Sequence, residues 1–354
     1  MKTLELFLKE STPISPSISW YLADIGESKG KQKLYTHQSP QKLKALKEHA
    51  LIESAVSSNR IEGVEISKDR IAPVILGQSN LRDRDEEEVR GYRNALEFIH
   101  QKEAKLPVSE KTILKLHRLI RGEIWDSGKY KDKDGDIIER YSDGRERVRF
   151  KTVTSKQTPN AMKGLISHWD EVIKLKSVHP MIALAAFNLD FLCIHPFRDG
   201  NGRVSRLLIL LQSYHLGLEV GRFISLERLI EENKGRYYET LEESSRGWHQ
   251  GRHDPWPYIG YTLFILKSAY REFEQRIGNL KERRGEKTAL ILQAIGHSKD
   301  SFHITDIQQK CPGVSVDMIR KVLKDLSTKA RIKCLGRGKS AKWKKIGKWP
   351  NTGS

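Results

Sequence analysis

The segment 195–206 places two glycines and two arginines at spacings suited to binding phosphate groups. Gly200 and Gly202 allow backbone amides to approach a ligand closely, at φ values that other residues avoid. A helix is predicted to begin just beyond them, and its N-terminus offers unpaired N–H groups and a positive dipole to an anion. Arg203 and Arg206 are three residues apart, so both project from one side of that helix. Two guanidinium groups beside such amides predict a polyphosphate site rather than a site for a single carboxylate.

The same segment contains a candidate base and a candidate metal ligand. His195 is suited to accept a proton from an attacking hydroxyl near neutral pH. Asp199 supplies one hard oxygen, and Mg²⁺ typically takes one or two carboxylates together with phosphate oxygens. Apolar sequence at 181–187 and 207–211 flanks the segment, which predicts a polar loop between two core helices. The alternative for each residue taken alone is structural: a satisfied histidine at a helix end, or a common glycine turn.

Taken in order, the residues HPFxDGNGRxxR over 195–206 resemble the complete signature of the Fic (Fido) family. The resemblance implies a mainly α-helical bundle with a β-hairpin flap that binds ATP and Mg²⁺. It implies transfer of AMP to a Ser, Thr or Tyr hydroxyl of a protein target, including the chain itself. His195 is then the general base and Asp199 the metal ligand. The implied ATP-binding positions are Gly200, Asn201, Gly202, Arg203, Val204, Ser205 and Arg206.

Far upstream, the stretch SNRIEG resembles the inhibitory motif of the same family. Ser58 and Glu62 are four residues apart, so they lie on one face of a helix expected over about 45–63, and the glycine that follows is suited to end it. The resemblance implies that Glu62 pairs with Arg206 and denies it to the γ-phosphate, as in the subclass with an N-terminal inhibitory helix. One alternative is an ordinary solvated glutamate. Another use of Glu62 is to orient a water that removes AMP from a modified target.

Two further segments resemble parts that surround the substrates in this family. Turn signals at Asp134-Gly135 and Asp143-Gly144, followed by alternation at strand period, predict a β-hairpin within 128–154. The hairpin resembles the flap that aligns a target segment by strand addition, and its alternative is a purely structural hairpin. Tyr238 resembles the aromatic residue beside the adenine, and the reverse assignment gives that place to Tyr237.

The length of 354 residues predicts more than one domain, with expected boundaries at 1–105, 106–280 and 285–348. In the first, residues 1 to about 45 are expected to be extended arms and loops, because prolines and glycines interrupt them. In the second, the catalytic bundle, Ser109 is expected to cap a helix. Early charge and the lack of a long apolar run predict neither a secretion signal nor a membrane span. Three scattered cysteines fit a reducing compartment, so we expect a cytoplasmic protein.

The C-terminal segment carries most of the net charge of +18, because residues 281–354 contain 18 Lys and Arg against six Asp and Glu. Its pattern of helix, helix-turn-helix and basic ribbon resembles a winged helix with Ser315 as a cap. DNA contact would use the basic side chains of Arg320, Lys321, Lys324, Arg337, Lys339, Lys342 and Lys344. The alternatives are a protein-contact module, which includes a homodimer, and a DNA-binding regulator that senses a nucleotide without turnover.

Overall fold

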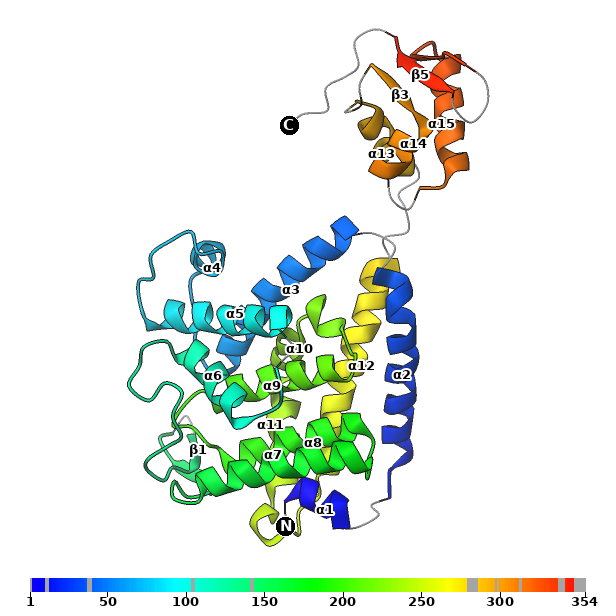
Figure 1. The fold of residues 1–354 in the computed structure, drawn as a ribbon. Coiled ribbons are helices and arrows are strands. Elements are labelled where there is room, and N and C mark those ends of the chain that lie inside the picture. Colours follow the sequence, from blue (N-terminus) through cyan, green and yellow to red (C-terminus); the bar gives the residue numbers. More distant parts are fainter. Residues whose placement is uncertain are drawn as a thin grey trace. The chain divides into compact units, whose positions relative to one another are not determined.

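A computed structural model shows a mainly helical protein, which confirms the fold class expected from the sequence (Figure 1). The chain consists of two compact units, unit 1 (Met1–Glu274) and unit 2 (Gln275–Ser354). Unit 1 holds both the expected inhibitory helix and the expected catalytic bundle. The structure describes residues 2–9, 13–36, 40–102, 106–140, 143–278, 286–296, 298, 300–311, 314–336 and 341–346.

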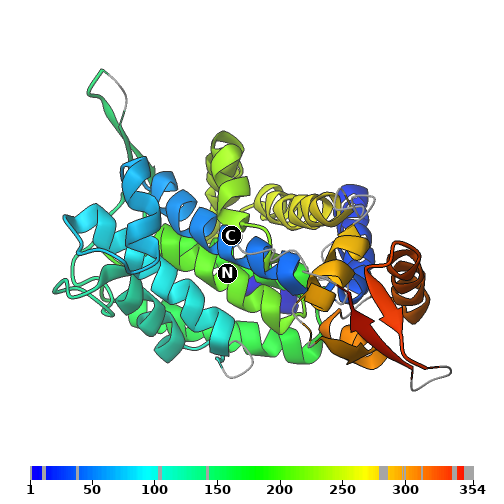
Figure 2. The same ribbon diagram turned by 90° about the horizontal axis from the view of Figure 1, so that it is seen from above.

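Unit 1 is built from helices and a β-hairpin (Figure 1 and Figure 2). Its α-helices are α1 (Thr3–Lys9), α2 (Pro16–Thr36), α3 (Pro40–Ile61), α4 (Lys68–Ile75), α5 (Arg84–Lys102), α6 (Glu110–Arg121), α7 (Thr158–Leu175), α8 (Pro180–Ile194), α9 (Asn201–His215), α10 (Leu226–Glu232), α11 (Lys234–Ser245) and α12 (Trp256–Gly278). The end of α12 falls in unit 2. Within the described parts of the chain, none of the helices combines the length and the apolarity that a membrane crossing requires.

Helix α8 forms the centre of unit 1, because every residue from Met181 to Ile194 is buried. Its sequence is apolar all round, which is typical of a helix surrounded by other elements. It packs against α7, α9 and α1. The buried polar residues on it are paired: Asn188 accepts a hydrogen bond from a tyrosine of α12, and Asp190 accepts bonds from the first residues of α1. Core packing therefore fixes the position of His195, which directly follows this helix.

The expectation of extended arms over residues 1 to about 45 is wrong, because α1, α2 and the start of α3 occupy most of this segment. Polar contacts hold α2 against α12. Lys267 Nζ lies 2.6 Å from Asp24 Oδ2, and Tyr270 OH donates to Gln32 Oε1 at 2.8 Å. The two glycines inside α2 lower its intrinsic helix propensity, and these long-range contacts outweigh that local preference.

Helix α3 ends as the sequence predicts, at a glycine in the left-handed region. Gly63 has a φ of 85°. Val64 N–H donates to Asn59 O, and Gly63 N–H donates to Arg60 O, both at 3.0 Å. This pair of bonds is the Schellman arrangement that closes helix C-termini. Glu62 therefore lies in the turn that directly follows α3.

The buried carboxylate of Glu227, in the first turn of α10, connects α3 to its neighbours. Glu227 accepts a hydrogen bond from Ser54 Oγ of α3 at 2.6 Å and from Tyr92 OH of α5 at 2.9 Å. Ser54 lies one helical turn before Ser58. The two bonds therefore fix the part of α3 that leads to Ser58 and Glu62.

The predicted hairpin is confirmed by β1 (Ile137–Arg140) and β2 (Glu146–Phe150), which pair antiparallel within the expected range 128–154. Ile138 lies opposite Val148, and both side chains are about half exposed, at 46% and 50%. Figure 2 shows the hairpin projecting from the helices of unit 1. The hairpin thus presents an apolar pair to the solvent.

Unit 2 consists of α13 (Glu286–Gly296), β3 (Ser301–His303), α14 (Ile304–Lys310), α15 (Val316–Thr328), β4 (Ile332–Cys334) and β5 (Lys342–Lys345). The strands form an antiparallel sheet in the order β3-β5-β4. Ser315 caps α15 as predicted, because its Oγ accepts from Met318 N–H at 3.3 Å. This order is consistent with a winged helix, although the sequence did not predict β3. Residues 312–313, between α14 and α15, and the basic residues Arg337 and Lys339 lie outside the described residues.

Candidate active site

The loop between α8 and α9 is held in one conformation by contacts of its own side chains. Asn201 accepts a hydrogen bond at Oδ1 from Phe197 N–H (2.9 Å) and donates from Nδ2 to Phe197 O (2.8 Å). The buried Phe197 ring stacks on the His117 imidazole of α6, with ring centroids 3.8 Å apart. His195, with a φ of 52°, ends α8, and Gly200, with a φ of 83°, is the N-cap of α9. The loop is therefore fixed at both ends and at its centre.

His195 is held in the tautomer that a base requires. Its Nδ1 lies 3.3 Å from the carbonyl oxygen of Leu192, and this nitrogen carries the proton because a carbonyl only accepts. The other ring nitrogen, Nε2, then keeps its lone pair. Burial lowers the pKa of His195 to about 4, so the imidazole is neutral at pH 7. His195 also lines a cavity, and a neutral imidazole in such a place is suited to accept a proton from a ligand.

The N-terminus of α9 has backbone geometry suited to an anion. The first backbone bond of the helix runs from Val204 N–H to Gly200 O at 2.9 Å, so the amides of residues 201–203 precede the helical hydrogen bonds. Gly202 lies in this turn, where a Cβ would lie 2.2 Å from Glu62 Oε1. The Glu62 carboxylate therefore lies where the helix dipole and the amides attract an anion.

Arg206 is tied to α3 and its end by three hydrogen bonds. Its Nε donates to Ser58 Oγ at 2.9 Å, and its Nη2 donates to Ser58 O at 2.8 Å and to Glu62 Oε1 at 2.7 Å. Burial alone would lower the pKa of Arg206, but the Glu62 carboxylate raises it above the ordinary value. Nη1 is buried and has no hydrogen-bond partner within the described part of the chain. The structure thus brings together the residues of the expected inhibitory contact and leaves one N–H group for another acceptor.

Asp199 and Arg203 belong to a charged network that includes residues of α5 and α6. Asp199 Oδ2 lies 2.6 Å from Arg121 Nη1, and Asp199 Oδ1 lies 3.3 Å from Arg203 Nη2. Arg203 Nη1 also binds Glu88 Oε2 at 2.5 Å. Burial opposes ionisation of Asp199, but Arg203 and Arg121 hold the pKa of its carboxyl below the usual value. Asp199 is therefore a carboxylate whose position is set by two buried arginines.

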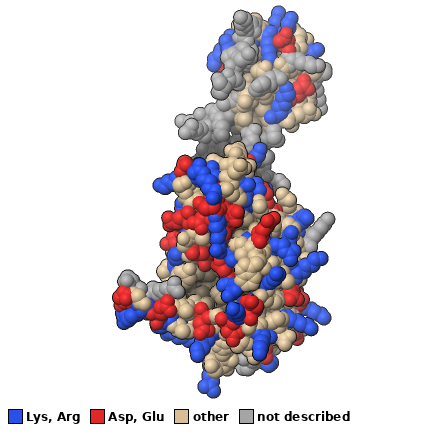
Figure 3. Space-filling view, turned by 90° about the vertical axis from the view of Figure 1, so that its left-hand side faces the viewer, with Lys and Arg blue, Asp and Glu red and all other residues tan. Residues whose placement is uncertain are grey.

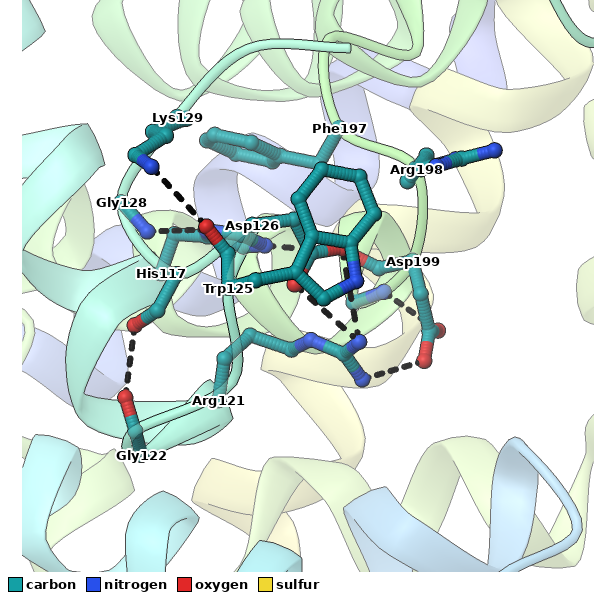
Figure 4. Close-up of polar contacts among 12 residues, drawn as sticks. His117, Arg121, Gly122, Trp125, Asp126, Gly128, Lys129, Phe197, Arg198 and Asp199 are labelled. Carbon is teal, nitrogen blue, oxygen red and sulfur yellow. Dashed lines mark hydrogen bonds and ion pairs between the residues drawn. The ribbon is translucent and has the colours of Figure 1, made fainter.

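His117 holds the backbone of the same residue, and Figure 4 shows its ring and Arg121 near Asp199. His117 Nδ1 accepts from Gly128 N–H at 2.9 Å, so Nε2 carries the proton and donates to Asp199 O at 3.1 Å. Burial lowers the pKa of His117 to about 4. A second proton on this ring would break the bond from Gly128, because Nδ1 would become a donor.

A cavity of about 340 Å³ lies among the loop, the end of α3, the hairpin and α11, within the size range of small-molecule sites. Tyr238 is half-buried at this cavity, whereas Tyr237 is 3% exposed and packs with the tyrosines of α12. The accessible ring is therefore that of Tyr238. The cavity is lined by Glu62, Ile137, Ile138, Arg149, Phe150, Leu192, Cys193, His195, Gly202, Tyr237, Tyr238, Leu241, Glu242 and Ser245.

Two residues of the expected ATP-binding set do not present free side chains. Val204 is fully buried in α9, and Ser205 Oγ donates to Gly202 O at 2.8 Å. A contact of either residue with a nucleotide would have to use its backbone. The Val204 amide already donates to Gly200 O. For Val204, the prediction is therefore that it lies near the nucleotide, and not that it bonds to it.

Sequence reasoning missed Glu88 and Arg121, which join Asp199 and Arg203 in the charged network. Glu88 lies near the acidic first turn of α5, and Arg121 lies in the basic last turn of α6. Charges at these places are already explained by the helix dipole, so neither stands out in the sequence. Their burial distinguishes them from solvated helix ends, because Glu88 is 4% and Arg121 is 6% exposed.

The face of unit 1 seen in Figure 3 carries acidic and basic side chains side by side. The exposed charges on that face are therefore of both signs and do not form a patch of one sign. The guanidinium groups at the loop differ from them in being buried.

Residues 107–213 match the model of the Fic/DOC family. The chain is 27% identical over 286 residues to "Protein adenylyltransferase Fic" of Drosophila virilis, a match that covers 75% of this chain and 53% of that protein. It is also 27% identical over 183 residues to "Protein adenylyltransferase Fic" of Drosophila grimshawi, covering 49% of this chain and 35% of that protein. The chain thus spans about a third to a half of the length of these curated relatives.

A solved structure of similar fold is that of a Fic family protein from Desulfovibrio desulfuricans G20. The TM-score is 0.62 and the identity is 23%, with 95% of this chain and 98% of that chain covered. At this identity the likeness concerns the fold alone.

Proposed function

We propose that the protein transfers AMP from ATP to a hydroxyl of a protein target, because residues 107–213 match the model of the Fic/DOC family. The observation that carries the proposal is the neutral His195, which lines a cavity together with Gly202 at the N-terminus of α9. A base beside an anion-binding helix end suits attack of a hydroxyl on a phosphate. The curated relatives named protein adenylyltransferase support this reaction.

The residues present fit a triphosphate. Three arginines at the loop each keep a buried guanidinium nitrogen without a partner in the described ranges: Nε of Arg121, Nε of Arg203 and Nη1 of Arg206. Buried donors of this kind normally have acceptors, and phosphate oxygens are suitable ones. The amides of residues 201–203 offer further donors to the phosphates. In this proposal Tyr238 lies beside the adenine, on the cavity side of α11.

In the proposed reaction His195 Nε2 accepts the proton of the target hydroxyl as its oxygen attacks the α-phosphorus. A new bond forms between that oxygen and the phosphorus, and the bond from the α-phosphorus to the bridging oxygen of pyrophosphate breaks. Arg203 and the amides at the α9 N-terminus stabilise the charge on the leaving pyrophosphate. His195 then holds the proton as imidazolium until it is lost to solvent.

Asp199 fits the role of a magnesium ligand. Its side chain is 48% exposed, and its ionised form is favoured by the neighbouring arginines. Within the described residues no group of three or more His, Cys, Asp and Glu side chains is arranged to hold a metal ion. Such a site would therefore combine Asp199 with phosphate oxygens of the nucleotide, as Mg²⁺ commonly does. The ion would supply positive charge to the phosphates when bound.

The proposal includes autoinhibition by Glu62. Its carboxylate bonds to Arg206 and lies over Gly202, where the terminal phosphates of ATP would otherwise bind. A carboxylate and a phosphate repel each other, so ATP takes a productive pose only when Glu62 moves away. Removal of AMP by the same residues, with Glu62 orienting a water, remains the second reaction that this arrangement would support.

The test compares ATP labelled at the α-phosphate with ATP labelled at the γ-phosphate. The Glu62→Gly protein is expected to acquire the α-label and not the γ-label, and Glu62→Gly/His195→Ala is expected to acquire neither. Transfer of the γ-label would instead indicate phosphoryl transfer. ATP binding without any transfer by Glu62→Gly would favour the nucleotide-sensing regulator.

For the target protein we propose docking on the hairpin, and for unit 2 we propose contact with nucleic acid. The exposed Ile138 and Val148 offer an apolar contact beside a strand edge. In unit 2, Lys321 and Lys324 are exposed on α15, the helix that a winged helix places in the major groove. Replacing both lysines by glutamate in the full chain is expected to weaken DNA binding and to reduce its salt dependence. Unchanged binding, or binding independent of salt, would assign unit 2 to protein contacts.

A further inference from the structure

Lys131 bonds to the residues on both sides of His195. Its backbone N–H donates to Pro196 O at 2.9 Å, and its side-chain Nζ donates to Ile194 O at 3.2 Å. The side chain is buried, with the residue 6% exposed. Both of these acceptors are backbone carbonyls, so the contacts act on the course of the chain through His195.

The same ammonium group reaches the base of the hairpin. Nζ donates to Thr152 Oγ1 at 2.8 Å, and the Thr152 hydroxyl in turn donates to Gly135 O at 2.5 Å. Gly135 precedes β1 and Thr152 follows β2, so both ends of the hairpin belong to this chain of bonds. Lys131 therefore connects the hairpin to the loop that carries His195.

The backbone of His195 needs such support. Its φ of 52° lies in the left-handed region, which is unfavourable for a residue with a side chain. Release of this residue into an ordinary conformation would redirect its ring, because the ring orientation follows the backbone. Bonds to the carbonyls immediately before and after it oppose that release.

Charge gives Lys131 a second effect on the same ring. Burial lowers the pKa of Lys131 to about 8, opposed by Asp134 and Asp136, so the group is mostly protonated at pH 7. Its ammonium and backbone amide donate to three neutral acceptors, which belong to Thr152, Ile194 and Pro196. The charged groups that act on His195 are Lys131, which lowers its pKa, and Glu62 and Asp199, which raise it.

We propose that Lys131 is a positioning residue for His195, which it holds in orientation and couples to the hairpin. This inference rests on the proposed function, because it assigns Lys131 a role in the same proton transfer. Lys131 does not contact the reacting atoms in this scheme. It acts by fixing where Nε2 lies, and its charge adds to the burial that lowers the pKa of the imidazole.

The experiment uses the full chain carrying Glu62→Gly, with Lys131→Met, Lys131→Arg and the matched control Lys133→Met, at an exposed position of the same segment. Lys131→Met is expected to lower kcat for label transfer by about 10- to 100-fold, because misplacement of a catalytic group by about 1 Å has an effect of this size. The KM for ATP should change by less than about threefold, since the phosphate site stays intact. Lys131→Arg, which keeps the charge and donors, should recover most of the rate.

The pH profile separates positioning from a general loss of structure. Loss of the positive charge should raise the pKa of His195, so the acidic limb of kcat should move to higher pH in Lys131→Met and not in Lys131→Arg. Thr152→Val removes only the hairpin partner of the ammonium, and it should lower kcat by a smaller factor. This second variant keeps the test decisive if Lys131→Met fails to fold.

Equal kcat and equal pH profiles for Lys131→Met and Lys133→Met would overturn the inference. So would a rate in Thr152→Val equal to that of the parent Glu62→Gly protein, where Lys131→Met does not fold. Failure of this inference is distinguishable from failure of the proposed function. If the proposed function fails, the parent Glu62→Gly protein transfers no label. If only the role of Lys131 fails, the parent protein is active.

Discussion

In the proposed autoinhibition, the free energy of the bond between Glu62 and Arg206 determines how strongly transfer is inhibited. Arg206 Nη2 and Glu62 Oε1 are 2.7 Å apart, and the side chains are 1% and 30% exposed. In this proposal, productive binding of the terminal phosphates has to break the contact, so its free energy adds to the barrier for transfer. The perturbation that removes it is Glu62→Gly, and Glu62→Gln removes the charge while keeping an acceptor.

Hydrogen bonds to charged groups contribute about 1.5–3 kcal/mol, and partial exposure of Glu62 favours the lower half of that range. A loss of about 1.5–2 kcal/mol corresponds to a rate increase of about 10- to 30-fold for Glu62→Gly. Glu62→Gln keeps the hydrogen bond and loses only the charge contribution of a partly exposed pair. That contribution is about 0.2–1 kcal/mol, or an increase of at most about fivefold.

The assay is the initial rate of α-label transfer at saturating ATP, with Glu65→Gly as a control of the same substitution at an exposed residue beyond α3. The expected order of rates is Glu62→Gly, then Glu62→Gln, then Glu65→Gly together with the unchanged protein. If Glu62→Gln were as fast as Glu62→Gly, charge alone would account for inhibition. If neither variant exceeded the control, the reasoning from the Arg206 contact would be refuted.

Three further predictions follow from neighbouring contacts. Ser54→Ala removes a donor to the buried Glu227 carboxylate, so α3 should loosen and basal label transfer should rise by a few-fold, with thermal unfolding as the control for general destabilisation. His117 has a pKa lowered to about 4 from an ordinary value near 6.5, so the stability that it contributes is complete above pH 6.5 and is lost as pH falls toward 4; His117→Gln should flatten the fall in unfolding free energy over that interval, and an unchanged slope would contradict the neutral state assigned to the buried ring. Asp199→Asn should raise the Mg²⁺ concentration needed for half-maximal transfer, and an unaltered Mg²⁺ dependence would exclude Asp199 as a ligand.

The central loop could be predicted from the sequence because its information is local. Gly200, Gly202, Arg203 and Arg206 lie within one turn or two of a helix start, so their spacing determines that they converge. The same holds for the glycine that ends α3, for the hairpin turns and for the serine caps of α6 and α15. In each case the residues that interact are within a few positions of one another, and local rules describe their geometry.

The rest of the site could not be predicted, since it depends on contacts between distant segments. Glu88 and Arg121 reach Asp199 and Arg203 from other helices, and dipole preference already accounted for their places in the sequence. Lys131 lies in a polar, charged stretch of sequence, although in the structure it is buried beside His195. The prediction of extended arms over the α2 segment is wrong for a related reason. The packing of this segment against α12 outweighs the low helix propensity of its two glycines.

The most direct test of the account is the intact mass of the Glu62→Gly protein after incubation with ATP and Mg²⁺, together with the pyrophosphate released. The account predicts a mass increase of one or more AMP units, an equal amount of pyrophosphate, and neither in Glu62→Gly/His195→Ala. Addition of phosphate units, or no addition while ATP is bound, would contradict it.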